Sequence, residues 1–167
     1  NDVRAFAAYQ EALRWHPSDW ELHFLLGRAY GDHLLFSQGT EHLKMSLSLN
    51  PWNVSTLYNL GVFLEKEQKM DEAVNAYLTL VTQAPDFRMA NMRLGHIAFS
   101  QKKFKEAEGY FKQVLLPAAY QHHELFNAHL GLALCYQRQG NLERMEKEML
   151  EAFLLNPNAA ERAFLDL

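Results

Sequence analysis

A group of histidines near residue 125 is the first place in this sequence to look for metal chemistry. His122, His123 and Glu124 are consecutive, and His129 follows five residues after Glu124. Zinc sites on helices place their ligands three or four residues apart on one face and draw further ligands from elsewhere. The histidines here lie six or seven residues apart. We therefore predict a solvated loop at this place and no metal site.

Two other side chains have types that serve in catalysis. Cys135 is the single cysteine, so no internal disulfide can form, and its place in an apolar run predicts a buried, inert thiol. His96 is expected to be a binding or core residue. The sequence has no glycine-rich phosphate loop, no nucleophile elbow and no zinc-protease helix. We predict that the chain is not an enzyme and needs no cofactor.

The composition is that of a folded protein with a mildly acidic surface. The 167 residues are 49% apolar and 22% charged, which argues against a disordered chain. The net charge of −4 argues against a nucleic-acid partner, which would require a basic face. No apolar stretch approaches the roughly 20 residues of a membrane span, so we expect no direct membrane contact in this segment. The localisation stays open.

Two residue types recur with a period of 34 residues. They are the prolines Pro17, Pro51 and Pro85 and the glycines Gly27, Gly61 and Gly95. Such a period predicts a stack of small structural units in place of a single closed core. The function of such a chain is therefore expected on the long surface that a stack of units offers and not in a catalytic cleft.

Each unit reads as two amphipathic helices. Positions twelve, eight and five residues before the prolines carry small or apolar side chains, as at Ala73, Tyr77 and Leu80, and this spacing marks one face of a helix. In the preceding helix a small residue, such as Gly61, is expected where a neighbouring helix approaches closely. The proline ends the second helix because it cannot continue the hydrogen-bond ladder.

This reading predicts where the helices lie. We expect a single helix over about 2–15, helix pairs over about 19–49, 53–83, 87–116 and 124–155, and a short helix from about Ala159. Gly39 and Ser46 are expected to weaken one second helix. Glu65, Lys66 and Glu67, and the acidic stretch 143–151, are expected on solvated helix backs, the latter with support from a Glu143–Lys147 pair.

The pattern resembles the tetratricopeptide repeat. The family combines an aromatic-Leu-Gly first helix, an alanine–aromatic–alanine second helix and a terminal proline, and Tyr58 to Gly61 followed by Ala73, Tyr77 and Pro85 is the best match here. The resemblance implies an all-α, right-handed superhelical solenoid of antiparallel helix pairs with about four and a half repeats. The sequence departs from the family at His23, Asn91 and His129, where tryptophan is common.

The repeat boundaries follow from this resemblance. We expect one domain over 1–167, with the second helix of a truncated repeat at 1–17. Full repeats are expected at 20–53, 54–87, 88–121 and 126–159, with an insertion at 122–125 and the start of a terminal helix at 160–167. Because the first repeat begins at its second helix, we expect that the segment is part of a longer protein.

In this family the first helices line a concave groove, which implies a protein or peptide partner. The groove residues implied here are Phe24, Arg28, Tyr58, Asn59, Val62, Met89, Met92, Arg93, His96, Asn127 and Arg138. Asn59 would bind a peptide backbone, and Arg28 and Arg93 would bind carboxylates. Only Asn59 and Arg93 match the family's two-carboxylate clamp for chaperone tails, so an adaptor of that kind is not expected.

Two alternatives stay open. The array can act as a spacer or as a self-association element that docks through its ends. It can also be a soluble domain appended to a larger protein, such as a bacterial membrane glycan ligase or polymerase or a glycosyltransferase, where such arrays position partners. The sequence itself does not choose between them.

Overall fold

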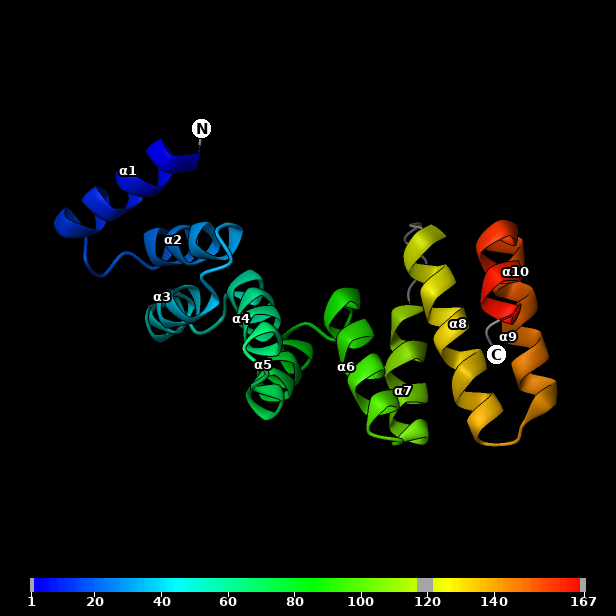
Figure 1. Cartoon of the computed structure of the whole chain (residues 1–167). Helices are drawn as coiled ribbons and strands as arrows, with labels where there is room; N and C mark the ends of the chain where they lie inside the picture. Colours follow the sequence, from blue (N-terminus) through cyan, green and yellow to red (C-terminus); the bar gives the residue numbers. More distant parts are fainter. Residues whose placement is uncertain (1, 117–121, 166–167) are drawn as a thin grey trace. The chain divides into compact units, whose positions relative to one another are not determined.

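The computed structural model describes residues 2–116 and 122–165, and these form ten helices and no strand (Figure 1). By its internal contacts the chain divides into two compact units, residues 1–84 and 85–167. Each unit is described by itself. The all-α repeat fold predicted from the sequence is confirmed, whereas the path of a superhelix over the whole chain and the single domain stay predictions.

The first unit is a run of five helices. They are α1 (Asp2–Trp15), α2 (Trp20–Asp32), α3 (Phe36–Leu49), α4 (Val54–Lys66) and α5 (Met70–Gln83). Helices α2 and α3 form one hairpin, and α4 and α5 form the next. Helix α3 is 14 residues long, as is α5, so Gly39 and Ser46 do not shorten it.

The second unit also contains five helices. They are α6 (Arg88–Ser100), α7 (Phe104–Val114), α8 (His122–Arg138), α9 (Leu142–Leu155) and α10 (Pro157–Leu165). The pairs α6–α7 and α8–α9 are hairpins, and α10 packs on α9. Helix α10 begins at Pro157, two residues before the predicted start, because proline fits the first turn of a helix. The side chain of Asn156 accepts a hydrogen bond from the amide of Ala159 at 3.2 Å and so caps this turn.

The loop predicted at 122–125 is wrong, because these residues are helical. Helix α8 begins at His122 and has 17 residues, whereas α2, α4 and α6 have 13 each. The difference of four residues equals the predicted insertion and adds about one turn to the helix. The extra residues therefore extend the first helix of the last full repeat. Residues 117–121, which precede it, lie outside the described part of the chain.

All four hairpins turn through the same backbone motif. The second residue after each first helix has a positive φ, and these residues are Leu34, Gln68, Lys102 and Gly140. In the first hairpin the amide of Leu35 donates to the carbonyl of Tyr30, and that of Leu34 donates to Gly31, both at 2.9 Å. This pair of bonds is a Schellman motif, which satisfies the last carbonyls of the helix. Of these four residues only Gly140 is of the type that adopts the left-handed conformation readily.

The core of the first unit depends on close contact between glycines and aromatic rings. Gly61 lies directly against the ring of the fully buried Tyr77, as predicted for a small residue in a first helix. Phe63 of α4 inserts between Gly31 and Gly39 of the preceding hairpin, where an added Cβ at Gly39 would lie 2.5 Å from its Cε2. The absence of a side chain at Gly39 is therefore required by the packing of the next repeat.

The second unit repeats this arrangement around Phe111. A Cβ added to Gly95 would lie 2.6 Å from its ring, and one added to Gly131 would lie 2.8 Å from it. Ala98, Ala107, Leu132, Cys135 and Tyr136 complete the buried cluster with Phe111. A first helix of one repeat thus packs into the hairpin of the repeat before it, in both units.

Two acidic stretches predicted to be solvated turn out to be partly buried. Glu65 accepts a hydrogen bond from the hydroxyl of Tyr77 at 2.6 Å, and Glu67 accepts one from Thr40 at 2.5 Å. Glu148, within the predicted acidic back of 143–151, contacts His129 at 2.7 Å. These carboxylates join helices to one another, a role that helical periodicity alone does not reveal. Among the described residues, no helix is both long and apolar enough to span a bilayer.

Candidate functional site

Every residue predicted for the groove lies on the first helix of a repeat. Helix α2 carries Phe24 and Arg28, α4 carries Tyr58, Asn59 and Val62, α6 carries Met89, Met92, Arg93 and His96, and α8 carries Asn127 and Arg138. Within the first unit α2 contacts α4, and within the second α6 contacts α8. The structure thus places the predicted residues on helices that contact each other within each unit. One groove that combines both units stays a prediction.

Helix α2 presents a cation that is held in place by an aromatic ring. The guanidinium carbon of Arg28 lies 5.7 Å from the centroid of the Phe24 ring, one helical turn away. Arg28 is exposed and Phe24 is half-buried. A cation over the face of a ring is attracted by its quadrupole, and the contact restricts the rotamers of the long side chain. Arg28 is therefore partly ordered before any ligand arrives.

Helix α4 places an amide beside an aromatic ring. Nδ2 of Asn59 donates to the carbonyl of Ser55 in the same helix at 2.7 Å, which fixes the orientation of the amide. A primary amide has a second N–H and an acceptor oxygen, and no described contact of Asn59 uses them. The ring of Tyr58 packs against that of Tyr77, with centroids 6.1 Å apart. The half-buried Asn59 thus has a donor and an acceptor available to a ligand backbone.

A small cavity lies between α1 and α2 beside Arg28. Its volume is about 150 Å³, and its lining residues are Ala5, Tyr9, Leu25, Arg28, Ala29, Asp32 and His33. Tyr9 and His33 were not among the predicted site residues. Tyr9 occupies the repeat position of Tyr77, but it is half-buried whereas Tyr77 is fully buried. This difference in burial, which periodicity does not show, makes its ring available to line the cavity.

In the second unit the predicted residues differ in how much they support the fold. Met92 packs against the buried cluster around Phe111, and the ring of His96 lies edge-on to Phe111 with centroids 5.3 Å apart. Met89 is 45% exposed, and Arg93 and Arg138 are also exposed. We infer that Met92 serves mainly the core and that Met89 is the thioether more accessible to a ligand.

The extra turn of α8 has a structural role. Glu124, which lies in this turn, contacts Arg88 of α6 with an N–O distance of 3.4 Å. Both side chains are largely buried. The insertion therefore connects the first helices of two successive repeats, and sequence analysis missed this contact because the partners lie 36 residues apart.

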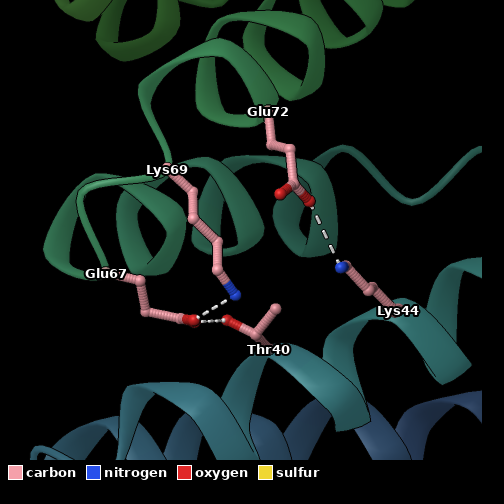
Figure 2. Close-up of polar contacts among 5 residues, drawn as sticks. All are labelled: Thr40, Lys44, Glu67, Lys69 and Glu72. Carbon is pink, nitrogen blue, oxygen red and sulfur yellow. Dashed lines mark hydrogen bonds and ion pairs between the residues drawn. The ribbon is translucent and has the colours of Figure 1, made fainter.

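Polar side chains also connect one second helix to the next repeat in each unit. Figure 2 shows the example in the first unit, where Thr40 of α3 and Lys69, at the start of α5, both donate to Glu67, and Lys44 reaches Glu72. Burial alone would raise the pKa of Glu67, but the hydrogen bonds from Lys69 and Thr40 outweigh it and lower this pKa below its ordinary value. This carboxylate fixes the end of α4 against α3.

The second unit has a similar polar centre at Glu108 of α7. This carboxylate accepts hydrogen bonds from Lys112 at 2.6 Å, from the hydroxyl of Tyr136 at 3.0 Å and from Gln139 at 3.2 Å. Burial opposes its ionisation, but these three donors lower the pKa of Glu108 below its ordinary value. Together, Thr40–Glu67 and Glu108–Tyr136 hold successive repeats in register, so that the predicted binding residues keep their relative positions within a unit.

Of the four side chains considered as metal ligands, the structure describes Glu124 and His129, and each of these contacts a different residue. Glu124 contacts Arg88 and His129 contacts Glu148, while the side chains of His122 and His123 lie outside the described part. Among the described residues, no three His, Cys, Asp or Glu side chains are grouped to hold a metal ion. Cys135 is fully buried, and burial followed by the charge of Glu108 raises its pKa to about 12.

A second hollow, which the sequence did not predict, lies between α9 and α10. Its volume is about 470 Å³, and its lining residues are Met145, Glu146, Met149, Leu150, Phe153, Ala160 and Glu161. Leu150 is 59% exposed and Phe153 is 48% exposed. This side of α9 is therefore an apolar surface bordered by two carboxylates.

Comparison with known families agrees with this architecture. Two models, both described as tetratricopeptide repeat, match residues 58–124 and 126–159, which together exceed half of the chain. The chain belongs to the tetratricopeptide repeat family. Among curated protein sequences, none matches it.

Several solved structures share the fold. A crystal structure of MamA is 20% identical, covers 93% of this chain and 89% of its own, and has a TM-score of 0.81. YrrB, described as a TPR protein with an unusual peptide-binding site, is 19% identical, covers 99% of this chain and 84% of its own, and has the same TM-score of 0.81. MamA from Desulfovibrio magneticus RS-1 is 17% identical over 94% of this chain and 86% of its own, with a TM-score of 0.77. At these identities the likeness concerns the fold.

Proposed function

We propose that the chain is a protein-interaction scaffold that holds an extended segment of a partner protein against its first helices. The observation that carries this proposal is the adjacency of α2 and α4, which present an ordered arginine and an amide with unused hydrogen-bonding capacity. Membership of the tetratricopeptide repeat family supports it, as does the fold shared with YrrB, whose own description names a peptide-binding site.

Asn59 is the proposed contact to the partner's backbone. Its bond to Ser55 holds the amide, so the remaining N–H and the oxygen can pair with a peptide carbonyl and amide at once. Such a contact is independent of the partner's side chains. A fixed amide also loses little conformational entropy on binding, which favours affinity.

Within each unit an arginine on a first helix, Arg28 in the first unit and Arg93 in the second, favours acidic partners. Both side chains are exposed on first helices, and a guanidinium can bind a carboxylate through two parallel hydrogen bonds. Each such charge-assisted interaction contributes about 1.5–3 kcal/mol. The partner is therefore an extended segment with at least one Asp, Glu or terminal carboxylate, and no catalytic step is part of this function.

The test selects peptides for the full chain from a random display library and measures their affinity for designed variants. Asn59→Ala combined with Arg28→Ala is expected to weaken a selected peptide at least tenfold and to leave helicity unchanged. The matched control combines Asn75→Ala with Lys105→Ala, which removes an amide and a cation exposed on the second helices α5 and α7. Equal affinity of the two double variants would contradict the assignment of the site to the first helices.

The exposed apolar face of α9 favours a second candidate function, which is self-association. Leu150, Phe153 and Leu154 are 59%, 48% and 68% exposed, and apolar surface of this kind often marks an interface. If a second copy covers this face, light scattering will show a molar mass that rises with concentration, and Phe153→Asp will abolish the rise. A concentration-independent monomer would exclude this candidate and leave the scaffold proposal untouched.

A further inference from the structure

One pair of positions, on the two helices of the hairpin, recurs in every full repeat and holds a different pair of residues each time. On the first helix this position is His23, Leu57, Asn91 and His129, and on the second helix it is His42, Ala76, Tyr110 and Glu148. The two members are 19 residues apart in each repeat. The side chains at this pair of positions are in polar contact in the first hairpin, as His23–His42, and in the last, as His129–Glu148.

The histidine at 23 is held by the loop that precedes its helix. Its Nε2 lies 3.0 Å from the carbonyl oxygen of Pro17. Asn91, at the same position two repeats later, donates to the carbonyl of Pro85 at 2.9 Å, so the contact recurs with a different donor. A carbonyl only accepts hydrogen bonds, so Nε2 of His23 carries the proton. In neutral His23 the other nitrogen, Nδ1, is therefore an acceptor.

The tautomer of His23 determines which nitrogen of His42 carries its proton. The Nδ1 atoms of His23 and His42 lie 3.1 Å apart, which is a hydrogen-bond distance. Since Nδ1 of neutral His23 accepts, Nδ1 of His42 donates to it. One further proton can be added at Nε2 of His42 without breaking this bond. A second added proton would occupy Nδ1 of His23, and two N–H groups on two cations would then face each other across 3.1 Å.

The groups around the pair do not offset a second positive charge. On α2 the ring of Tyr30 stacks on His42 at 5.4 Å, and on α3 the carboxylate of Glu41 is the nearby anion. Helix α1 reaches the cluster through Phe6, whose ring lies edge-on to Tyr30 at 4.8 Å. No described contact joins a charged group of α1 or α4 to either imidazole. Burial, then the neighbouring His23, lower the pKa of His42, and Glu41 raises it by less.

The carboxylate of Asp19 is engaged elsewhere. It accepts hydrogen bonds from the backbone amides of Glu21 and Leu22 at 2.9 and 3.2 Å and so caps α2.

The last hairpin provides the contrast. There the partner of His129 is the carboxylate of Glu148, so adding a proton to His129 produces an ion pair in place of two opposed cations.

We propose that His23 and His42 form a pH-sensitive contact that holds α2 against α3 while the pair carries at most one added proton, and that releases them when it carries two. Release also disturbs the stack from His42 through Tyr30 to Phe6 of α1. Mild acid therefore loosens the beginning of the chain, whereas the hairpin α8–α9 keeps its contact. This inference goes beyond binding in the groove and does not depend on it.

The direction of the pH effect follows from the lowered pKa of His42. A histidine whose pKa in the folded chain lies below its ordinary value of 6.5 binds fewer protons than in the unfolded chain. Its contribution to stability is therefore present at neutral pH and is lost as the pH falls below about 6.5. The loss should appear first in α2 and α3.

Hydrogen exchange of the full chain at pH 7.5 and pH 5.0, corrected for intrinsic exchange rates, tests the proposal. We expect protection in α2 and α3 to fall more at pH 5.0 than protection in α8 and α9. His42→Gln should remove this difference, and the matched variant His129→Gln should leave it in place. Equal losses in the two hairpins of the unmodified chain, or an unchanged difference in His42→Gln, would overturn the proposal.

A second measurement covers the case in which His42→Gln folds poorly. Nuclear magnetic resonance of the imidazole protons in the unmodified chain follows each histidine during a pH titration. The pKa of His42 is expected to lie below its ordinary value of 6.5, and neutral His23 is expected to carry its proton on Nε2, because this atom donates to the Pro17 carbonyl. A pKa of His42 at or above 6.5, or a proton on Nδ1 of neutral His23, would overturn the proposal.

Discussion

The ring of Phe111 lies against the backbone of Gly95, so closely that a methyl group on Gly95 would come within 2.6 Å of the ring. Phe111 is 1% exposed and Gly95 is buried in the middle of α6. Glycine in a helix normally costs stability because of its backbone entropy. Here it permits α6 and α7 to approach closely enough to bury a phenylalanine, which a side chain at 95 would prevent.

Replacement of this glycine is predicted to destabilise the chain. Gly95→Ala places a methyl group inside the contact distance of the Phe111 ring, so the ring or the helix must move. We expect a loss of about 1–3 kcal/mol in the free energy of unfolding, as is usual for overpacked cores. Urea unfolding followed by circular dichroism measures this loss.

The matched control for that variant lies in the facing helix. A Cβ added at Gly109 of α7 meets no atom within 4 Å. Gly109→Ala should therefore stabilise the chain by about 0.5–1 kcal/mol, because alanine has the better helix propensity. If both variants change stability in the same direction, packing at Gly95 is not the reason for the glycine.

The hairpin turns provide a second prediction. Lys102 has a φ of 61° although it is not glycine, and its side chain is exposed. Lys102→Gly should relieve the strain of the left-handed conformation and raise the free energy of unfolding by up to about 1 kcal/mol. Gly140, with φ of 75°, is the counterpart, and Gly140→Ala should lower it by about 1 kcal/mol. Thermal unfolding of the two variants should shift the midpoint in opposite directions, and equal shifts would contradict the shared turn geometry.

Thr40 provides a third prediction, which concerns the polar contact between repeats. Thr40→Val keeps the shape but removes the buried donor to Glu67, and we expect a loss of about 1–2 kcal/mol at pH 7. The exposed Thr79, whose hydroxyl bonds within its own helix, supplies the control Thr79→Val, with a change below about 0.5 kcal/mol.

The same variant has a predicted pH dependence. Because the pKa of Glu67 is lowered in the folded chain, its contribution is present above its ordinary value of 4.5 and is lost as the pH falls through the lower folded value. The stability difference between the unmodified chain and Thr40→Val should therefore be smaller at pH 3 than at pH 7. Urea unfolding at both pH values measures it, and a difference that grows in acid would show that Glu67 is not the acceptor.

Cys135 provides a fourth prediction, which concerns chemical reactivity. A thiol with a pKa of about 12, against an ordinary value of 9.0, has about a thousandth of the usual thiolate at neutral pH. The folded chain should react with iodoacetamide at pH 8 at least about a thousandfold more slowly than the chain unfolded in urea. Since this is the single cysteine, mass spectrometry follows the reaction without ambiguity. Rapid labelling of the folded chain would contradict the burial of α8 in the preceding hairpin.

The sizes of the side chains that pack against one another in the core are poorly predicted from the sequence. Phe63 of α4 and Cys135 of α8 occupy the same position in two repeats. Each of these two side chains packs into the hairpin that precedes its own helix. The large Phe63 meets Gly31 and Gly39, whereas the small Cys135 packs with Phe99 and Ala107 at the equivalent positions. The spacing predicted that these positions are buried. The exchange of size between residues 24 to 36 apart becomes visible only when the helices are packed.

The candidate site also has features that the sequence predicted and features that only the packed structure shows. The period of 34 residues located the first helices, because helical periodicity is a property of the local sequence, and the resemblance to the repeat family implied that the binding residues lie on them. It gave no sign that Phe24 orders Arg28 or that Ser55 holds the amide of Asn59. It also missed Tyr9 and His33, since their availability depends on how α1 and α2 leave a cavity between them.

By itself the sequence determined the kind of element, its length and its repetition, since these depend on side chains three, four and 34 residues apart along one chain. The tertiary structure decided which polar residues join the repeats. The carboxylates of Glu65, Glu67 and Glu148 look like solvated residues in the sequence, yet each is partly buried against a donor from another helix. A hydrogen bond depends on distances of about 3 Å between atoms, and only the packing of helices against one another fixes such distances.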